Sequence, residues 1–210
     1  IFTFMGLLFF LSAGTFHYWE AWIFLLTLGI PATFVIFYFY KKDPEFIERR
    51  ILKRREKEKD QKVLQNFLSL VFLIGLLIPG FDFRFDWSKF PLILTIVSSI
   101  FVFFGYLIMV LAMNKNRFAS TIIETSDRQI VINSGPYRIV RHPMYSGAFI
   151  VFIFMPLALG SFWALFPFLF GVPVSLVLRI ISEETYLIRN LSGYKDYCLK
   201  TKYRLIPFIW

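Results

Sequence analysis

Apolar residues form long runs along this chain, and the polar residues collect between the runs. An α-helix needs about 20 consecutive apolar residues to cross the hydrocarbon core of a bilayer. The candidate helices cover residues 1–16, 19–40, 63–80, 90–113, 145–160 and 162–179. The first run could instead be a signal peptide, but no small-residue cleavage site follows it and the next run begins at once. We therefore predict that the first four runs all cross the membrane.

The run from residue 142 to residue 178 contains no Asp, Glu, Lys or Arg. It is too long for one crossing and somewhat short for two full crossings. It therefore predicts a tight helical hairpin that dips into the membrane, with Gly160 and Ser161 near its tip, and that returns both ends to the same surface. The polar residues at those ends are Arg141, His142, Tyr145, Arg179, Glu183 and Glu184. Polar groups gathered where apolar helices meet are costly, so they are usually functional.

The composition agrees with a membrane protein. Of the 210 residues, 57% are hydrophobic, and the mean hydropathy is +0.62. The 28 phenylalanines suit lipid-facing helices better than a soluble core. The predicted fold is an all-α integral membrane protein with four spans, a C-terminal helical hairpin, and a cytosolic loop and tail. We predict a transmembrane scaffold over residues 1–113, and the loop, hairpin and tail, with the chemistry, over residues 114–210.

The net charge of +9 is concentrated on one predicted face. If every run crosses, 21 of the 23 Lys and Arg residues lie on one side of the membrane, as expected for the cytoplasmic side. The basic excess then reflects topology, with attraction to anionic headgroups as a second effect, and nucleic acid is not an expected partner. This orientation predicts a multi-pass protein whose two termini and polar cluster are all cytoplasmic.

The connecting segments predict secondary structure but little chemistry. Residues 41–62 alternate in charge, which is typical of a solvated helix with i,i+4 pairs. Residues 121–123 and 129–132 are rich in β-branched side chains and precede an Asn-Ser-Gly-Pro turn, which predicts a short strand or an extended loop over the cytoplasmic mouth. The only cysteine, Cys198, excludes an internal disulfide and a cysteine metal cluster. With His17 on the opposite face, no metal site is expected.

Several separated motifs in the second half form a specific pattern. They are Gly135-Pro136-Tyr137-Arg138, Arg141-His142-Pro143-Met144-Tyr145, Glu183-Glu184, Gly193-Tyr194-x-x-Tyr197 and Tyr203-Arg204-Leu205-Ile206-Pro207. In this order and spacing they resemble the isoprenylcysteine carboxyl methyltransferase family, which is part of a wider group of membrane methyltransferases that includes phospholipid N-methyltransferases. The resemblance covers roughly residues 105–210. It implies that these motifs enclose S-adenosylmethionine at the cytosolic face, and that an intramembrane cleft admits a lipid substrate.

The residue types suit that donor molecule. Tyrosine faces attract a sulfonium cation, carboxylates bind its ammonium or hydroxyl groups, and cationic side chains bind its carboxylate. No Gly-rich strand–turn–helix precedes the motifs, so the site would not be of the Rossmann type. The predicted cofactor-binding residues are Tyr137, Arg138, Arg141, His142, Pro143, Tyr145, Glu183, Glu184 and Tyr197. Methyl transfer needs little acid–base help, so positioning would supply most of the catalysis.

Each of these residues, taken singly, also has a purely structural interpretation. Arg138 and Arg141 could contact lipid headgroups at a helix start, and Pro143 suits the first turn of a helix. Arg179 and Glu183 stand at i,i+4 and could form a salt bridge, although Arg before Glu is the weaker order. Only the shared order and spacing of the motifs favour a functional site.

Arg179 and Glu184 are the predicted catalytic residues. The resemblance links an Arg four residues before the paired glutamates to carboxyl methylation, and a guanidinium binds a carboxylate bidentately. The preferred acceptor is therefore the carboxylate of a prenylated cysteine or an analogue, with a membrane lipid as an alternative partner. At Gln129-Ile130-Val131 the chain departs from relatives, which often show His-x-Leu-Val, so no role for that histidine is carried over.

Three other functions stay open. The first is a phospholipid or small-amine N-methyltransferase. The second is an NADPH-dependent protein similar to sterol reductases, whose C-terminal part resembles the segment 203–207, although those proteins are longer and have more spans. The third is a non-catalytic membrane scaffold or transporter, which would not require this polar cluster and would be expected to show repeated halves. The sequence leaves the physiological acceptor and the oligomeric state open.

Overall fold

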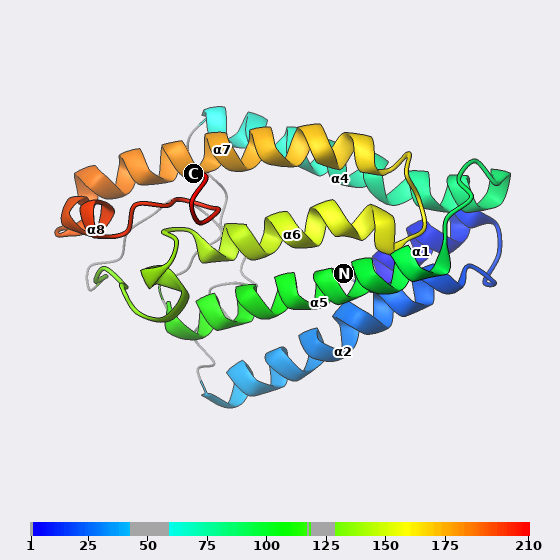
Figure 1. Ribbon diagram of the computed structural model, residues 1–210, viewed down its shortest axis with the longest axis horizontal. Helices are drawn as coiled ribbons and strands as arrows, with labels where there is room; N and C mark the ends of the chain where they lie inside the picture. Colours follow the sequence, from blue (N-terminus) through cyan, green and yellow to red (C-terminus); the bar gives the residue numbers. More distant parts are fainter. Residues whose placement is uncertain (1, 43–58, 117, 119–128) are drawn as a thin grey trace.

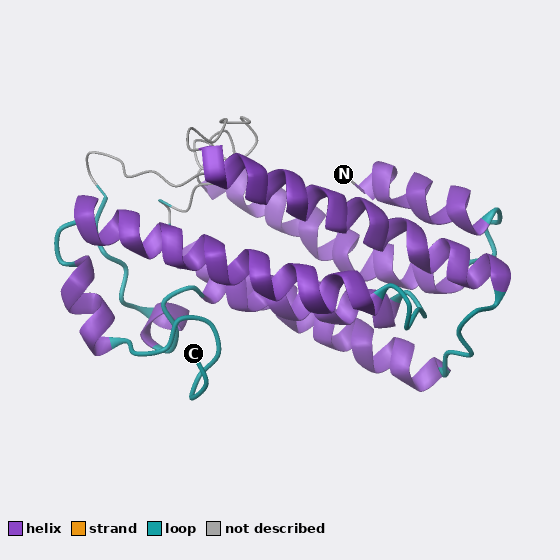
Figure 2. Cartoon of the chain, turned by 90° about the horizontal axis from the view of Figure 1, so that it is seen from above, coloured by secondary structure: helices purple, strands orange, loops and turns teal. Residues whose placement is uncertain are grey.

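The computed structural model describes residues 2–42, 59–116, 118 and 129–210. Throughout these residues the regular structure is helical and no strand is formed (Figures 1 and 2). The helices are α1 (Phe2–Ala13), α2 (Trp19–Lys42), α4 (Lys59–Phe85), α5 (Leu92–Lys115), the 3₁₀ helix η1 (Gly135–Arg138), α6 (Pro143–Ala158), α7 (Leu165–Asn190) and α8 (Tyr194–Lys200). The predicted all-α membrane fold is confirmed.

The six long helices run lengthwise in one bundle. α6 packs between α5 and α7, α4 packs on α7 and α1, and α2 packs on α5 (Figure 1). η1, α8 and the tail lie together at one end, the left end in Figure 1, which we call the α8 end. The core between the helices is aromatic and aliphatic, with Phe9, Phe24 and Phe168 fully buried.

Among the described residues, four helices are long and apolar enough to cross a membrane: α2, α4 from Lys62, α5 and α7. α1 has 12 residues and α6 has 16, or about 18 and 24 Å at 1.5 Å per residue, less than the ~30 Å of a bilayer core. The helix within the run 1–16 is thus shorter than the run itself, and its crossing of the membrane stays a prediction. The second arm of the hairpin, α7, is among the four candidates.

Glycines bring α5 and α6 into close contact. A Cβ atom on Gly147 would lie 2.4 Å from the carbonyl oxygen of Gly105, and a Cβ on Gly105 would lie 2.8 Å from that of Gly147. Small residues allow helix backbones to approach closely in membranes, where dispersion contacts replace the hydrophobic effect as the driving force. This contact fixes the position of α6, and hence of Tyr145 near its first turn.

The hairpin forms where the apolar run predicts it. α6 and α7 run antiparallel, and Gly160 adopts a φ of +72° in the turn between them, a conformation that glycine adopts at little cost. The turn is fastened to the scaffold, because the Tyr18 hydroxyl donates to the Leu159 carbonyl at 2.5 Å and the buried Ser161 hydroxyl donates to Asp82. Both arms therefore return to the α8 end.

The predicted helix over residues 41–62 lies mostly outside the described residues, as does the β-branched segment 121–123. Residues 129–133 have no regular secondary structure, in agreement with the extended-loop alternative. The β-type pairing recorded in the described chain is a single parallel bridge between Val140 and Tyr203.

Candidate active site

The tail is held against the segment that leads into α6. The Arg141 amide donates to the Tyr203 carbonyl and the His142 amide to the Arg204 carbonyl, both at 2.9 Å. The Ser146 hydroxyl donates to the Leu205 carbonyl at 2.5 Å. Because Pro143 begins α6, these contacts place the tail beside the point where the chain enters the hairpin.

Glu184 is the centre of a buried ionic cluster. Its side chain on α7 accepts hydrogen bonds from Arg141 Nε at 2.5 Å and from Arg204 Nε at 2.8 Å, and its Oε1 lies 3.2 Å from His142 Nε2. The carboxylate is 5% exposed. A buried charge is tolerated when it is paired and hydrogen-bonded, so this cluster ties α7, the start of α6 and the tail together.

The cluster also orients Arg141 and His142. Arg141 Nη1 donates to the Thr201 and Lys202 carbonyls at 2.8 and 2.9 Å, which uses the guanidinium edge not facing Glu184. The His142 ring stacks on the Tyr145 ring, with centroids 5.6 Å apart. Two of the predicted cofactor-binding residues are therefore held in fixed orientations.

A second chain of polar contacts lies on the hairpin side of this cluster, toward the turn between α6 and α7. The Tyr145 hydroxyl donates to Glu183 Oε2 at 2.6 Å, and Arg179 Nε lies 3.4 Å from the same hydroxyl. Arg179 precedes Glu183 by one helical turn, about 6 Å farther into the hairpin. The arrangement places a cationic and an anionic group side by side where the apolar helices begin.

A cavity opens between these residues and the aromatic residues of α8. Its lining residues are Asn116, Phe118, Gln129, Ile130, Val131, Ile132, Tyr137, Arg141, His142, Met144, Tyr145, Glu183, Leu187, Leu191, Tyr194 and Tyr197. The Tyr197 hydroxyl donates to the Tyr137 carbonyl at 2.7 Å. Burial raises the pKa of the Tyr194 and Tyr197 phenols, so both side chains remain neutral aromatic surfaces near neutral pH.

The cavity brings together six of the predicted residues: Tyr137, Arg141, His142, Tyr145, Glu183 and Tyr197. The other four predicted residues lie outside its lining. Arg138 is exposed and Pro143 serves as the first residue of α6. Glu184 lies behind Arg141 and His142, and Arg179 lies beyond Tyr145 toward the membrane. Direct contact of any of the ten residues with a bound cofactor stays a prediction.

The prediction missed three residues with clear contacts. Tyr194 lines the cavity, Arg204 pairs with Glu184, and the Asn116 amide donates to the Tyr137 hydroxyl at 3.3 Å. Tyr194 and Arg204 both stand inside the recognised motifs, so their positions in those motifs could have marked them as site residues. Asn116 follows directly after α5 and has no motif around it, so no feature of the sequence marked it.

Comparisons with known proteins find relatives of the part of the chain that forms this site. Residues 93–193, from the start of α5 to the loop before α8, match the model of the phospholipid methyltransferase family. This part of the chain is thus similar to a family of methyltransferases. A curated relative, the protein-S-isoprenylcysteine O-methyltransferase of Dictyostelium discoideum, is 30% identical over 141 residues, which cover 60% of this chain and 56% of the relative. The two findings confirm the predicted resemblance, although the chain spans only a little over half of that relative's length.

Proposed function

We propose that this chain is a membrane methyltransferase that takes its methyl group from S-adenosylmethionine and acts on a lipophilic acceptor. The single observation that carries the proposal is the lined cavity at the α8 end, which joins aromatic faces, a carboxylate and fixed cationic groups next to the mouth of an intramembrane hairpin. The family match and the relative's name support the same chemistry.

The residues of the cavity suit S-adenosylmethionine. When bound, this donor supplies an electrophilic methyl group on a sulfonium ion. The faces of Tyr137, Tyr194 and Tyr197 suit the sulfonium or the adenine ring, and a cation–π contact contributes up to about 2 kcal/mol when desolvated. The Glu183 carboxylate lines the cavity and can accept from an ammonium group, while the Arg141 guanidinium supplies positive charge at the cavity wall for a carboxylate and His142 lines the same wall.

Positioning supplies most of the catalysis in this proposal, because displacement at a methyl carbon needs little proton transfer. Glu184 acts through Arg141 and His142, since its carboxylate already accepts from them and from Arg204. It is therefore proposed as a positioning residue. The chain's own contribution is to hold the cavity wall rigid and to exclude water between the helices.

Arg179 is proposed to bind the acceptor. It lies one turn nearer the membrane than Glu183, on the path by which a lipid-borne polar group would reach Tyr145. A planar guanidinium binds a carboxylate through two parallel hydrogen bonds. This favours a carboxylate acceptor, preferably that of a prenylated cysteine or an analogue, as the name of the Dictyostelium relative also suggests.

The second candidate is methylation of a phospholipid or small amine. The specific observation in its favour is the family model that residues 93–193 match, whose description is phospholipid methyltransferase. An ammonium or amine acceptor gains nothing from a guanidinium at Arg179, so the two candidates differ in their dependence on that residue.

Two measurements on purified protein in lipid nanodiscs test these proposals. Calorimetric titration with S-adenosylmethionine should show binding, and titration with NADPH should show none. Labelled methyl groups should then appear on a prenylated cysteine and not on phosphatidylethanolamine. Binding of NADPH alone would favour the reductase alternative, and binding of neither would favour a non-catalytic scaffold. Methylation of phosphatidylethanolamine alone would favour the second candidate.

A further inference from the structure

Residues 205–210 form a small closed loop whose tip is apolar and exposed. The Leu205 and Ile206 amides donate to the Trp210 carbonyl, and the Trp210 amide donates to the Ile206 carbonyl, at 2.9 to 3.1 Å. Leu205, at the base, is buried. At the tip, Phe208 is 86% exposed, the highest value among the large hydrophobic residues described. Ile209 is 77% exposed, which is also among the highest values.

The backbone presents this tip outward. Phe208 has a φ of +66°, which is rare for a bulky residue and persists only where the surroundings impose it. The turn is fixed by the hydrogen bonds across the base and by the contact of the Arg204 guanidinium with the Trp210 ring, 5.2 Å from its centroid. The Phe208 ring touches the Tyr203 ring but stays largely exposed, and exposed large apolar side chains on a fixed turn indicate an interaction surface.

The position of the loop indicates what covers it. In Figure 2 the loop projects from the flank of the bundle, whereas α8 lies at the end of the long axis. Its base is bonded to Ser146 in the first turn of α6, where the apolar run of the hairpin starts. With the apolar run in the membrane, as its composition predicts, that level is the boundary between headgroups and hydrocarbon. Exposed Lys200 and Lys202 nearby suit anionic headgroups.

We propose that the loop 205–210 inserts Phe208 and Ile209 into the lipid leaflet that borders the α8 end. Trp210 and Arg204 then lie at headgroup level, where an aromatic ring and a long cationic side chain are both favoured. Because Arg204 also pairs with Glu184, the lipid surface is linked through two side chains to the wall of the cavity. The loop is thus an interfacial anchor of the candidate site.

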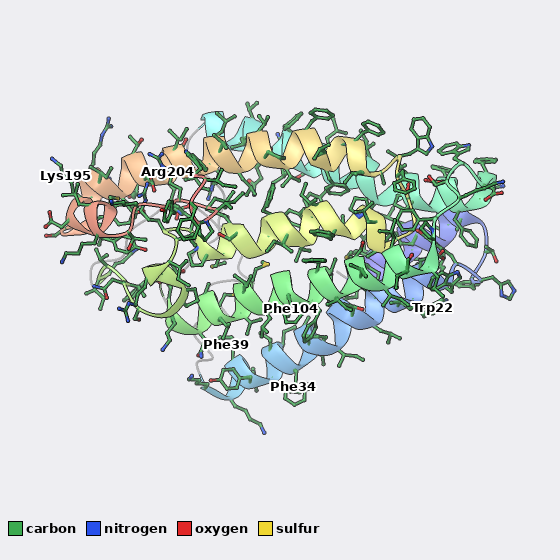
Figure 3. All side chains as sticks on the ribbon, viewed as in Figure 1. Trp22, Phe34, Phe39, Phe104, Lys195 and Arg204 are labelled. Atoms are coloured by element: carbon green, nitrogen blue, oxygen red, sulfur yellow. The ribbon has the colours of Figure 1, made fainter. Side chains whose placement is uncertain are left out.

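The test measures the depth of the loop in full-length protein. Single cysteines at Phe208 or Ile209, in a Cys198→Ser background, carry an environment-sensitive dye, and nanodiscs of phosphatidylcholine and phosphatidylserine carry nitroxide lipids labelled near the headgroup. Lys195, exposed on α8 at the far end of the molecule (Figure 3), provides the matched control. Ile209→Cys leaves the contact between the Tyr203 and Phe208 rings intact, so it remains informative if Phe208→Cys disturbs the turn.

We expect several-fold stronger quenching at positions 208 and 209 than at position 195. Equal quenching at all three positions would overturn the anchor. A blue-shifted dye that the nitroxide lipids do not quench would also overturn it, because the loop would then lie against protein, such as a second copy of the chain. The readout does not depend on methyl transfer, so it stands apart from the proposed activity.

Discussion

At the residue scale, neighbouring glutamates on α7 have different surroundings. Glu183 faces the cavity and accepts a hydrogen bond from Tyr145, whereas Glu184 is enclosed by Arg141, His142 and Arg204. The sequence shows only an adjacent pair and cannot separate them, because consecutive helical residues point about 100° apart and their neighbours come from distant segments. In the structure, therefore, Glu183 lines the cavity and Glu184 holds the buried ionic cluster together.

The different surroundings predict that the same substitution at the two positions affects different quantities: fold stability at Glu184 and cofactor affinity at Glu183. Glu184→Gln leaves the buried Arg141 without its charge partner and should lower the free energy of unfolding by about 3–5 kcal/mol. Glu183→Gln should leave stability nearly unchanged and weaken S-adenosylmethionine binding by about 1.5–3 kcal/mol, or roughly tenfold or more. Thermal unfolding and calorimetric titration in detergent check the pair. If Glu184→Gln unfolds like the wild type, the buried ionic cluster does not stabilise the fold and this assignment is wrong.

Arg179→Lys keeps the positive charge but loses the planar fork. For a carboxylate acceptor we expect kcat/KM to fall about tenfold or more, the equivalent of losing one charged hydrogen bond. Affinity for S-adenosylmethionine should change little, and turnover of an amine acceptor should also change little. Radiometric methyl transfer to each acceptor, together with titration of the donor, measures these quantities. Loss of donor binding in this variant would contradict the assignment of Arg179 to the acceptor.

At the element scale, the contact of α5 with α6 sets the cavity's geometry. Gly147→Ala places a Cβ 2.4 Å from the Gly105 carbonyl oxygen, so the helices must separate, at a cost of about 1–3 kcal/mol for overpacking. Gly29→Ala in α2 is the control, because no heavy atom lies within 4 Å of its added Cβ. Melting temperature should fall for the first variant and stay level or rise for the second. A similar fall in both variants would contradict a specific effect of the contact between α5 and α6, because helix propensity alone favours Ala over Gly.

The hairpin could be predicted from the sequence, whereas the helix contacts could not. An apolar run of that length with glycine near its middle permits few arrangements, since every backbone group must be bonded inside the membrane. The pairing of Gly105 with Gly147 depends instead on which helices become neighbours. Other glycines also occur in the apolar runs, so the sequence does not show which two meet. The same limit applies to α1, whose helix ends at Ala13 although apolar residues continue to Phe16.

At the scale of the whole molecule, the α8 end and the hairpin turn lie at opposite ends of the bundle (Figure 1). The distribution of basic residues predicts that the α8 end is cytoplasmic. In a Cys198→Ser background, Lys200→Cys should resist an impermeant thiol reagent added to intact cells, and Lys89→Cys, exposed near the other end, should react. The reverse pattern would invert the topology and move the candidate site to the outside.

The bridge between Val140 and Tyr203 has a consequence for biosynthesis. The ribosome makes residues 201–204 after all the helices that surround the cavity, since chains emerge N-terminus first. Until then Glu184 lacks Arg204, and the Arg141 and His142 amides lack the two carbonyl oxygens that accept from them. A nascent chain can therefore insert its hairpin before its cavity wall is complete, and the wall is completed only once residues 201–204 have been made.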